Sequence, residues 1–163
     1  MLEVGKPFPA FSLPDQDARI HQLSDYAGKW LVVYFYPKDD TPGCTIQGKT
    51  MTAAKPAYDK EAIAIVGVSQ DDVPSHKSFC EKFSFKIDLL ADPKAELMKA
   101  CGLNQGEWQG MKFWERTSFI VDPKGIVRKV FAKVNPNGHD KALLEAVKEL
   151  QRHDLAATNP RRH

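Results

Sequence analysis

The 163-residue chain has little cysteine and no CxxC pair: its thiols are Cys44, Cys80 and Cys101. Three thiols are too few for a disulfide framework in an intracellular chain, so each is a core residue, a redox group or a ligand. The missing CxxC pair argues against a dithiol oxidoreductase that works through two closely spaced cysteines. The odd count leaves at least one cysteine unpaired.

The chain also lacks an excess of charge and a long apolar run. Its formal net charge is +2, and charged residues make up 27% of it. Neither nucleic acid nor an acidic membrane is needed to explain that balance. The first segment, MLEVGKPFPAFSLPDQD, has an acid and two early prolines but no stretch long enough for a signal peptide or a spanning helix. We therefore expect a cytoplasmic protein without a nucleic-acid or membrane partner.

No repeat, low-complexity tract or Ser/Gly linker interrupts the sequence, and its length suits one domain over residues 1–163. Residues 1–28 carry several turn signals and are predicted to form a segment that caps the core. The final residues, from about 152 onward, are predicted to be a frayed tail.

Apolar runs alternate with helical patterns along the rest of the chain. Strands are predicted over residues 30–36, 62–69, 87–91, 117–122 and 126–132. Helices are predicted over residues 45–60, 71–83, 95–101 and 139–151, with Pro56 expected to kink or end the first of them. This order predicts an α/β fold with a mixed central sheet flanked by helices.

Cys44 stands at the predicted start of a helix, in the stretch YPKDDTPGCTIQGK. A helix N-terminus leaves backbone N–H groups unpaired and carries a partial positive charge, so it stabilises a thiolate. Pro42 and Gly43 suit a tight turn, and the Thr41 hydroxyl can turn into the same pocket. An arbitrary intracellular cysteine would be interpreted as a small core residue. The strand–loop–helix context favours a reactive thiol instead.

The segments YPKDDTPGCT and ERTSFIVDPKG resemble the peroxiredoxin family, and within it the bacterioferritin-comigratory-protein class, the Q-type peroxiredoxins. The similarity runs from VGKPFPAFSLPDQD through the last helix. It implies a thioredoxin-like fold and the reduction of hydrogen peroxide and organic hydroperoxides by a thiol. It also implies a monomer, re-reduced by thioredoxin or a similar dithiol, and we expect no cofactor and no metal.

The resemblance assigns roles to four positions. Cys44 matches the peroxidatic cysteine, and Arg116 matches the arginine at the start of the following strand. Thr41 and Pro42 match the loop positions that build the pocket of that cysteine. These roles are physically reasonable, because a guanidinium near Cys44 would stabilise a thiolate and polarise a peroxide oxygen. Without the resemblance, a lone arginine at a strand end would be interpreted as solvated.

Two residues depart from the pattern of the class. Many members carry a resolving cysteine at the position of Lys49, so that route to a disulfide is absent here. Gln47 stands where an acidic residue is common, and this change is expected to loosen the hydrogen bonds that orient Arg116.

Cys80 and Cys101 remain as candidates for the resolving thiol. Cys80 lies on the helix after the second strand, which is similar to the position of the resolving cysteine in another branch of the class. Cys80 is therefore predicted to be the resolving cysteine, and Cys101 to be a structural thiol. The phenylalanines beside Cys80 leave open that it merely packs in the core, and Cys101 would replace it if it lay closer to Cys44. Since two helices rarely hold thiols at bonding distance, we expect local unwinding after oxidation.

Three other interpretations stay open. His76 and Cys80, spaced i and i+4, could bind a metal with Cys101 or another histidine as a third ligand, although a solvated His76 is the simpler alternative. A holdase-type interaction protein would use the fold without Cys44. The aromatic residues Trp108, Phe113 and Trp114 could form an interface, a lip over the site, or ordinary core packing.

Overall fold

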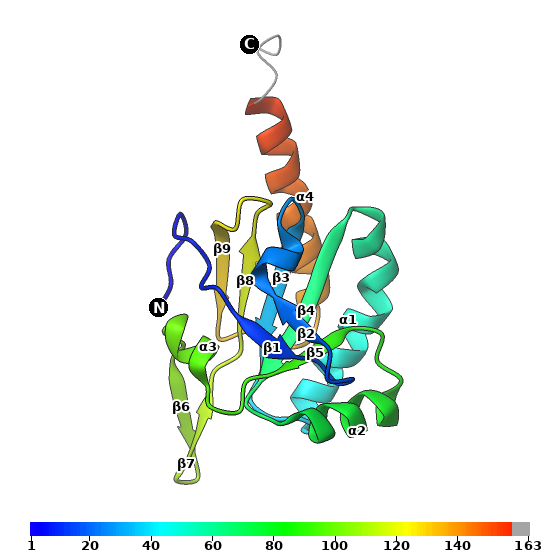
Figure 1. The fold of residues 1–163 in the computed structure, drawn as a ribbon, viewed down its shortest axis with the longest axis vertical. Coiled ribbons are helices and arrows are strands. Elements are labelled where there is room, and N and C mark those ends of the chain that lie inside the picture. The colour runs from blue at the N-terminus through cyan, green and yellow to red at the C-terminus, as the bar shows by residue number, and fades with distance from the viewer. Residues whose placement is uncertain (158–163) are drawn as a thin grey trace.

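The computed structural model describes residues 1–157, and a five-stranded sheet forms its centre (Figure 1). The strands, in their spatial order, are β5 (Asp88–Ala91), β4 (Ile63–Ser69), β3 (Trp30–Phe35), β8 (Thr117–Val121) and β9 (Val127–Ala132). Strands β3, β4 and β5 are parallel, whereas β8 pairs antiparallel with both β3 and β9. The predicted α/β architecture with a mixed sheet is confirmed.

Helices cover both faces of this sheet. The helices are α1 (Pro42–Lys60), α2 (Val73–Phe83), α3 (Glu96–Ala100) and α4 (His139–Ala157). Side chains of α1, α2 and α4 join one apolar cluster, whereas α3 and the N-terminal segment contribute to the other. Within residues 1–157, no helix combines the length and the apolar character that crossing a membrane requires.

The two apolar clusters lie on opposite faces of the sheet because successive side chains of a strand point in opposite directions. On β3, Val32 belongs to the first cluster and its neighbour Val33 belongs to the second. Cys44 and Cys80 lie in the first cluster, and Cys101 lies in the second. The sheet therefore separates Cys101 from the other two thiols.

Two short hairpins were not predicted from the sequence. The N-terminal hairpin consists of β1 (Ser12–Pro14) and β2 (Ile20–Gln22), followed by the short 3-10 helix η1 (Leu23–Tyr26). The second hairpin consists of β6 (Gln105–Trp108) and β7 (Met111–Trp114). The predicted capping role of residues 1–28 is compatible with the burial of Phe8 and Phe11, but part of the cap is a sheet.

One helix ends where the sequence predicts and another runs further. Helix α1 continues through Pro56 to Lys60, the predicted end, and its last turn is held by Tyr58, whose hydroxyl donates to the Asp140 carbonyl at 2.6 Å. Helix α4 runs to Ala157, so the fraying predicted from about residue 152 is wrong as far as residue 157. Its end is fixed because Arg128 of β9 donates two 2.8 Å hydrogen bonds to Asp154. The rest of the predicted tail lies outside the described residues.

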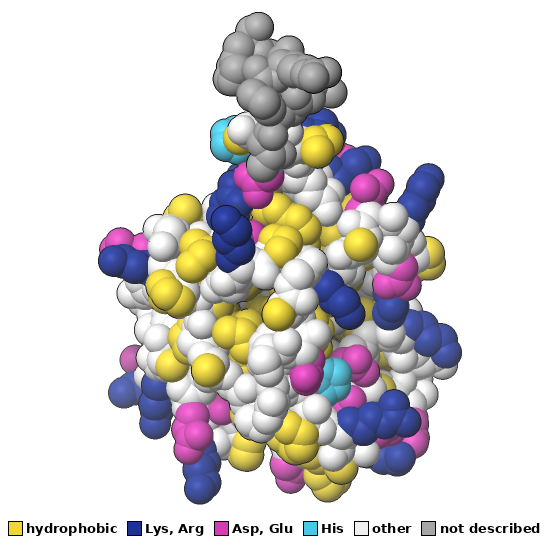
Figure 2. Space-filling model, turned by 45° about the horizontal axis from the view of Figure 1, so that its top comes forward, with side chains coloured by type: hydrophobic (Ala, Val, Ile, Leu, Met, Phe, Trp, Pro, Cys, Tyr) yellow, Lys and Arg dark blue, Asp and Glu magenta, His cyan; other side chains and the backbone are white. Residues whose placement is uncertain are grey.

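Charged side chains of both signs are interspersed on the face shown in Figure 2, with apolar side chains between them. This mixture agrees with the small net charge of the chain, +2.

Candidate active site

Cys44 lies in the first turn of α1, where the chain returns from the end of β3. The helix begins at Pro42, with Thr41 as its extended N-cap residue, slightly earlier than the sequence predicted. Proline suits this position because its fixed φ is helical and its missing N–H needs no partner. The first-turn N–H groups have no partner within the helix, so the thiol sits in a field that favours negative charge. The Cys44 side chain is buried, at 2% exposure.

Arg116 reaches this thiol from the segment directly before β8. Its Nη2 donates to Cys44 Sγ at 3.1 Å, and its Nη1 donates to Gln47 Oε1 at 2.9 Å. The pairing of β8 with β3 brings the two distant segments together. Arg116 is therefore a fixed donor to the sulfur and not a solvated arginine at a strand end.

Gln47 holds the guanidinium from the same helix face as Cys44. Its side chain is fully buried, and its bond to Arg116 forms despite the absence of a carboxylate. The predicted loosening is therefore not seen in this geometry. The Gln47 amide nitrogen has no hydrogen-bond partner among residues 1–157. A neutral amide also leaves the charge of Arg116 uncompensated at this contact, which favours a negative sulfur beside it.

Gly43 is a site residue whose role the sequence did not reveal. A Cβ atom at this position would lie 2.5 Å from Arg116 Nη2. That separation is shorter than a van der Waals contact, so a side chain here would push the guanidinium away from Cys44. The glycine thus provides space for Arg116 in addition to the turn predicted for it.

The Thr41 hydroxyl donates to the Lys38 carbonyl at 2.9 Å. With its hydrogen engaged in that bond, the hydroxyl oxygen faces other groups as an acceptor. Pro42, next to it, is exposed at the start of α1.

Cys80 lies in α2 and is 8% exposed. Burial, followed by the charge of Asp39, raises the pKa of Cys80 to about 12. Its sulfur is therefore a protonated thiol near neutral pH in this closed conformation. Burial is the largest of the causes that raise the pKa of Tyr34, a neighbour in the same apolar cluster, well above its usual value.

Cys101 is fully buried on the opposite face of the sheet. Burial, followed by Asp92, raises its pKa to about 12. All three cysteines are free. Because the sheet lies between Cys101 and Cys44, the geometry favours Cys80 as the partner of Cys44.

His76 is neither solvated nor placed to share a metal with Cys80 and Cys101. It is fully buried, with Nδ1 2.7 Å from Asp39 Oδ2 and Nε2 donating to the Leu90 carbonyl at 3.0 Å. Both ring nitrogens are thus occupied by protein groups. Cys101, the third ligand considered from the sequence, lies across the sheet from Cys80.

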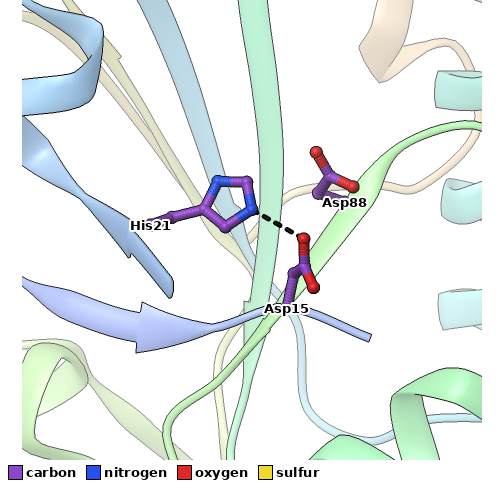
Figure 3. A group of neighbouring side chains, drawn as sticks. All are labelled: Asp15, His21 and Asp88. Carbon is purple, nitrogen blue, oxygen red and sulfur yellow. Dashed lines mark hydrogen bonds and ion pairs between the residues drawn. The ribbon is translucent and has the colours of Figure 1, made fainter. Parts of the chain in front are cut away.

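Another group, Asp15, His21 and Asp88, has its ligand atoms within 4.8 Å of one another (Figure 3). His21 Nε2 pairs with Asp15 at 2.7 Å, and its Nδ1 lies 2.7 Å from the Tyr26 hydroxyl. Burial acts to raise the pKa of Asp15, but hydrogen bonds from His21 and from the backbone N–H groups of Asp17 and Arg19 lower it overall. Asp15 and His21 are therefore already paired within the N-terminal hairpin, whereas Asp88 of β5 accepts a 2.9 Å hydrogen bond from Gln16 Nε2.

The aromatic segment before Arg116 forms the β6–β7 hairpin. Trp108 and Met111 are 69% and 73% exposed, so core packing does not explain them. Trp114 is partly buried and its Nε1 donates to Gln70 Oε1 at 3.0 Å. The hairpin is therefore anchored at one end and exposes apolar side chains at the other.

Comparison with known proteins relates this geometry to one family. Residues 4–130 match the AhpC/TSA family. Peroxiredoxin Bcp from Xanthomonas campestris pv. campestris is 41% identical over 129 residues, which cover 77% of this chain and 81% of that protein.

Solved structures give the same relation. The structure of a cysteine-to-serine mutant of Xylella fastidiosa PrxQ superposes with a TM-score of 0.88 at 30% identity, covering 93% of this chain and 98% of that one. A Xanthomonas campestris bacterioferritin comigratory protein, studied for alkyl peroxide reduction activity, superposes with a TM-score of 0.82 at 36% identity, covering 91% and 97%. These similarities confirm the predicted thioredoxin-like fold.

Proposed function

The chain belongs to the AhpC/TSA family and is an enzyme of the peroxiredoxin type, and from this premise we propose that Cys44 is the thiol that attacks the peroxide. The observation that carries the proposal is the 3.1 Å hydrogen bond from Arg116 Nη2 to Cys44 Sγ. It joins a helix N-terminus and a fixed guanidinium at one sulfur, and both favour the thiolate.

In the first step, the Cys44 thiolate attacks the nearer peroxide oxygen. The S–O bond forms while the O–O bond breaks, and the distant oxygen takes a proton and leaves as water or an alcohol. Arg116 donates to the charge that moves from sulfur to oxygen, and the Thr41 oxygen accepts the hydrogen of the incoming peroxide. Cys44 becomes a sulfenic acid.

In the second step, Cys80 resolves the sulfenic acid as an intramolecular disulfide. Cys80 shares the apolar cluster of Cys44, whereas Cys101 does not. A disulfide requires Cα atoms within about 7 Å, which two separate helices rarely provide, so we propose that α2, the first turn of α1, or both unwind locally. The opening also brings the Cys80 thiol into water, which removes the main cause of its raised pKa.

The substrates we propose are hydrogen peroxide and organic hydroperoxides, and the reductant is thioredoxin or a similar dithiol. The work on alkyl peroxide reduction by the Xanthomonas campestris protein supports the organic substrates. A dithiol would open the Cys44–Cys80 disulfide by exchange through a mixed disulfide.

We further propose a cytoplasmic monomer that works as a single domain. Three free cysteines suit a reducing compartment, where thiols persist. Light scattering after size-exclusion chromatography tests the monomer, and cell fractionation tests the compartment. A dimer at micromolar concentration, or recovery outside the cytoplasm, would contradict these two points separately.

The experiment that tests the function is peroxide consumption with thioredoxin and its reductase. Wild type is compared with Cys44→Ser, Cys80→Ser and Cys101→Ser. Cys44→Ser is expected to abolish turnover, Cys80→Ser to abolish turnover with thioredoxin, and Cys101→Ser to retain it. Turnover that survives Cys44→Ser would contradict the proposal and favour a holdase-type role, which does not need this thiol.

A further inference from the structure

A buried hydrogen-bond network ties α2 to the loop that carries Cys44. Asp39, in that loop, has Oδ2 2.7 Å from His76 Nδ1 and accepts a 2.8 Å hydrogen bond from the Ser75 hydroxyl on the same oxygen. Its Oδ1 accepts from the Tyr36 hydroxyl at 2.6 Å. One carboxylate thus joins the end of β3 to the first turn of α2.

His76 extends the network to the sheet. Its Nε2 carries a hydrogen because its partner, the Leu90 carbonyl at 3.0 Å, only accepts. The side chains of His76 and Asp39 are 0% and 4% exposed. Leaving either one without its partner would strand a buried polar group, which costs more than an ordinary surface bond.

Cys80 follows His76 by one helical turn, so it lies between two polar links from α2 to the Cys44 loop. The second link, from Lys82 Nζ to Asp40 Oδ2 at 2.8 Å, joins side chains that are 58% and 48% exposed. Exposed pairs contribute little because water screens them. The buried Asp39–His76 pair is therefore the stronger polar link between the two segments that bear the reacting thiols.

We propose that the Asp39–His76 pair sets the rate at which α2 opens to bring Cys80 to oxidised Cys44. The inference rests on the proposed function, in which the Cys80 sulfur attacks the Cys44 sulfenic acid. The S–S bond forms, the S–O bond breaks, and the sulfenic hydroxyl leaves as water with the Cys80 proton. Asp39 and His76 are positioning residues in this step, since they act through the segments that they join.

The consequence of weakening the pair follows from its place in the closed conformation. The pair stabilises α2 where Cys80 is buried and protonated, so its loss raises the population of the open state. Faster opening gives faster disulfide formation. It also leaves the sulfenic acid less time to react with a second peroxide and become a sulfinic acid.

The test follows a single turnover after one equivalent of hydrogen peroxide. Sulfenic acid is trapped with dimedone, and the disulfide is quantified by acid quench and mass spectrometry. Asp39→Asn and His76→Gln are each expected to speed formation of the Cys44–Cys80 disulfide roughly 10- to 100-fold. They are also expected to lower the yield of sulfinic acid in excess peroxide. The double variant should match the single ones, because all three lose the same bond.

The Asp15–His21 pair of the N-terminal hairpin provides a matched control (Figure 3). It is also a mostly buried aspartate–histidine pair at 2.7 Å, but it lies outside α2 and the Cys44 loop. Asp15→Asn is expected to leave the rate of disulfide formation within about twofold of wild type. Ser75→Ala removes only one bond to Asp39, so it serves if Asp39→Asn does not fold, with an expected acceleration of roughly two- to fivefold.

The outcomes separate the two hypotheses. Unchanged rates in Asp39→Asn, His76→Gln and Ser75→Ala, or an equal acceleration in Asp15→Asn, would overturn the role of the Asp39–His76 pair. If wild type forms no Cys44–Cys80 disulfide at all, the resolving step of the proposed function is wrong and the pair has no such step to control.

Discussion

The guanidinium of Arg116, directly before β8, donates to the sulfur of Cys44 in the first turn of α1 across 3.1 Å. The same guanidinium is held by Gln47 at 2.9 Å, so its direction is fixed before any substrate arrives. A donor that is already oriented loses little freedom during the reaction. Changes to Arg116, or to the residues that hold it in place, should therefore lower the rate of peroxide attack.

Removing the guanidinium is expected to slow the attack step. Arg116→Ala should lower the second-order rate constant for hydrogen peroxide roughly 100-fold, as loss of one preorganised donor does elsewhere. Arg116→Lys should recover only part of this loss, because an ammonium group lacks the planar fork that bonds Gln47 and Cys44 together. Stopped-flow measurement of the rate constant provides the test. Arg128→Ala removes a guanidinium on β9 as a control, and an equal loss there would contradict the assignment.

Gly43→Ala is expected to lower activity without lowering stability. The added Cβ would lie 2.5 Å from Arg116 Nη2, so the guanidinium must move, and misplacement on this scale slows a reaction roughly 10- to 100-fold. Alanine at a helical position also favours folding over glycine by about 0.5–1 kcal/mol. Urea unfolding and stopped-flow kinetics on the same sample test both parts. A variant with the wild-type rate constant would show that Arg116 tolerates displacement.

The place of Cys44 could be predicted from the sequence because its signals are local. A buried apolar strand, a Thr-Pro-Gly turn and a helix follow one another, and the structure places the thiol in the first helical turn. The contact with Arg116 joins residues far apart in the chain, so only the resemblance suggested it. His76 was misinterpreted for the same reason, since a histidine on a helix looks solvated until Asp39 is placed beside it.

The missed elements depend on contacts that leave no periodic pattern. Strands β6 and β7 have four residues each and are mostly exposed, so no alternation of polar and apolar residues marks them. The last turn of α4 is ordered by the bonds between Arg128 and Asp154, two residues on different elements. The composition near the end of the chain predicts fraying, but it cannot show that Asp154 is bonded to a residue of another element.

The pH dependence of disulfide formation is expected to report the open state. In the closed structure, burial raises the pKa of Cys80 to about 12. If α2 opens before attack, the Cys80 thiol regains the ordinary cysteine pKa of about 8.5. The rate of disulfide formation should then rise with pH, with its midpoint near that pKa. Quench-flow measurement of the Cys44–Cys80 disulfide across that range tests this. A rate that rises only toward pH values of about 12 would mean that the buried thiol attacks without opening.

Stability is expected to fall between neutral and mildly acidic pH because of His139. Its Nε2 lies 2.9 Å from the Ser118 hydroxyl, and burial lowers its pKa from 6.5 to about 4. Above pH 6.5 the imidazole is neutral in both states. As pH falls below that value, the unfolded chain binds a proton that the folded chain does not, so the free energy of unfolding decreases until about pH 4.

The matched variants isolate this histidine from other acid-sensitive groups. Urea unfolding at neutral and mildly acidic pH should show a smaller pH-dependent loss in His139→Gln than in wild type. His153→Gln removes an exposed histidine of the same helix and should keep the wild-type dependence. An unchanged pH dependence in His139→Gln would contradict the assignment to His139.

The most direct test of the central claim is to map the oxidised cysteines by mass spectrometry after one equivalent of hydrogen peroxide, without a reductant. Wild type is expected to form the Cys44–Cys80 disulfide with Cys101 reduced. In Cys80→Ser, oxidation is expected to stop at a sulfenic acid on Cys44. In Cys44→Ser, neither Cys80 nor Cys101 is expected to be oxidised by the peroxide. Oxidation of Cys80 or Cys101 at the wild-type rate in Cys44→Ser would contradict the account, because the first attack would then belong to another sulfur.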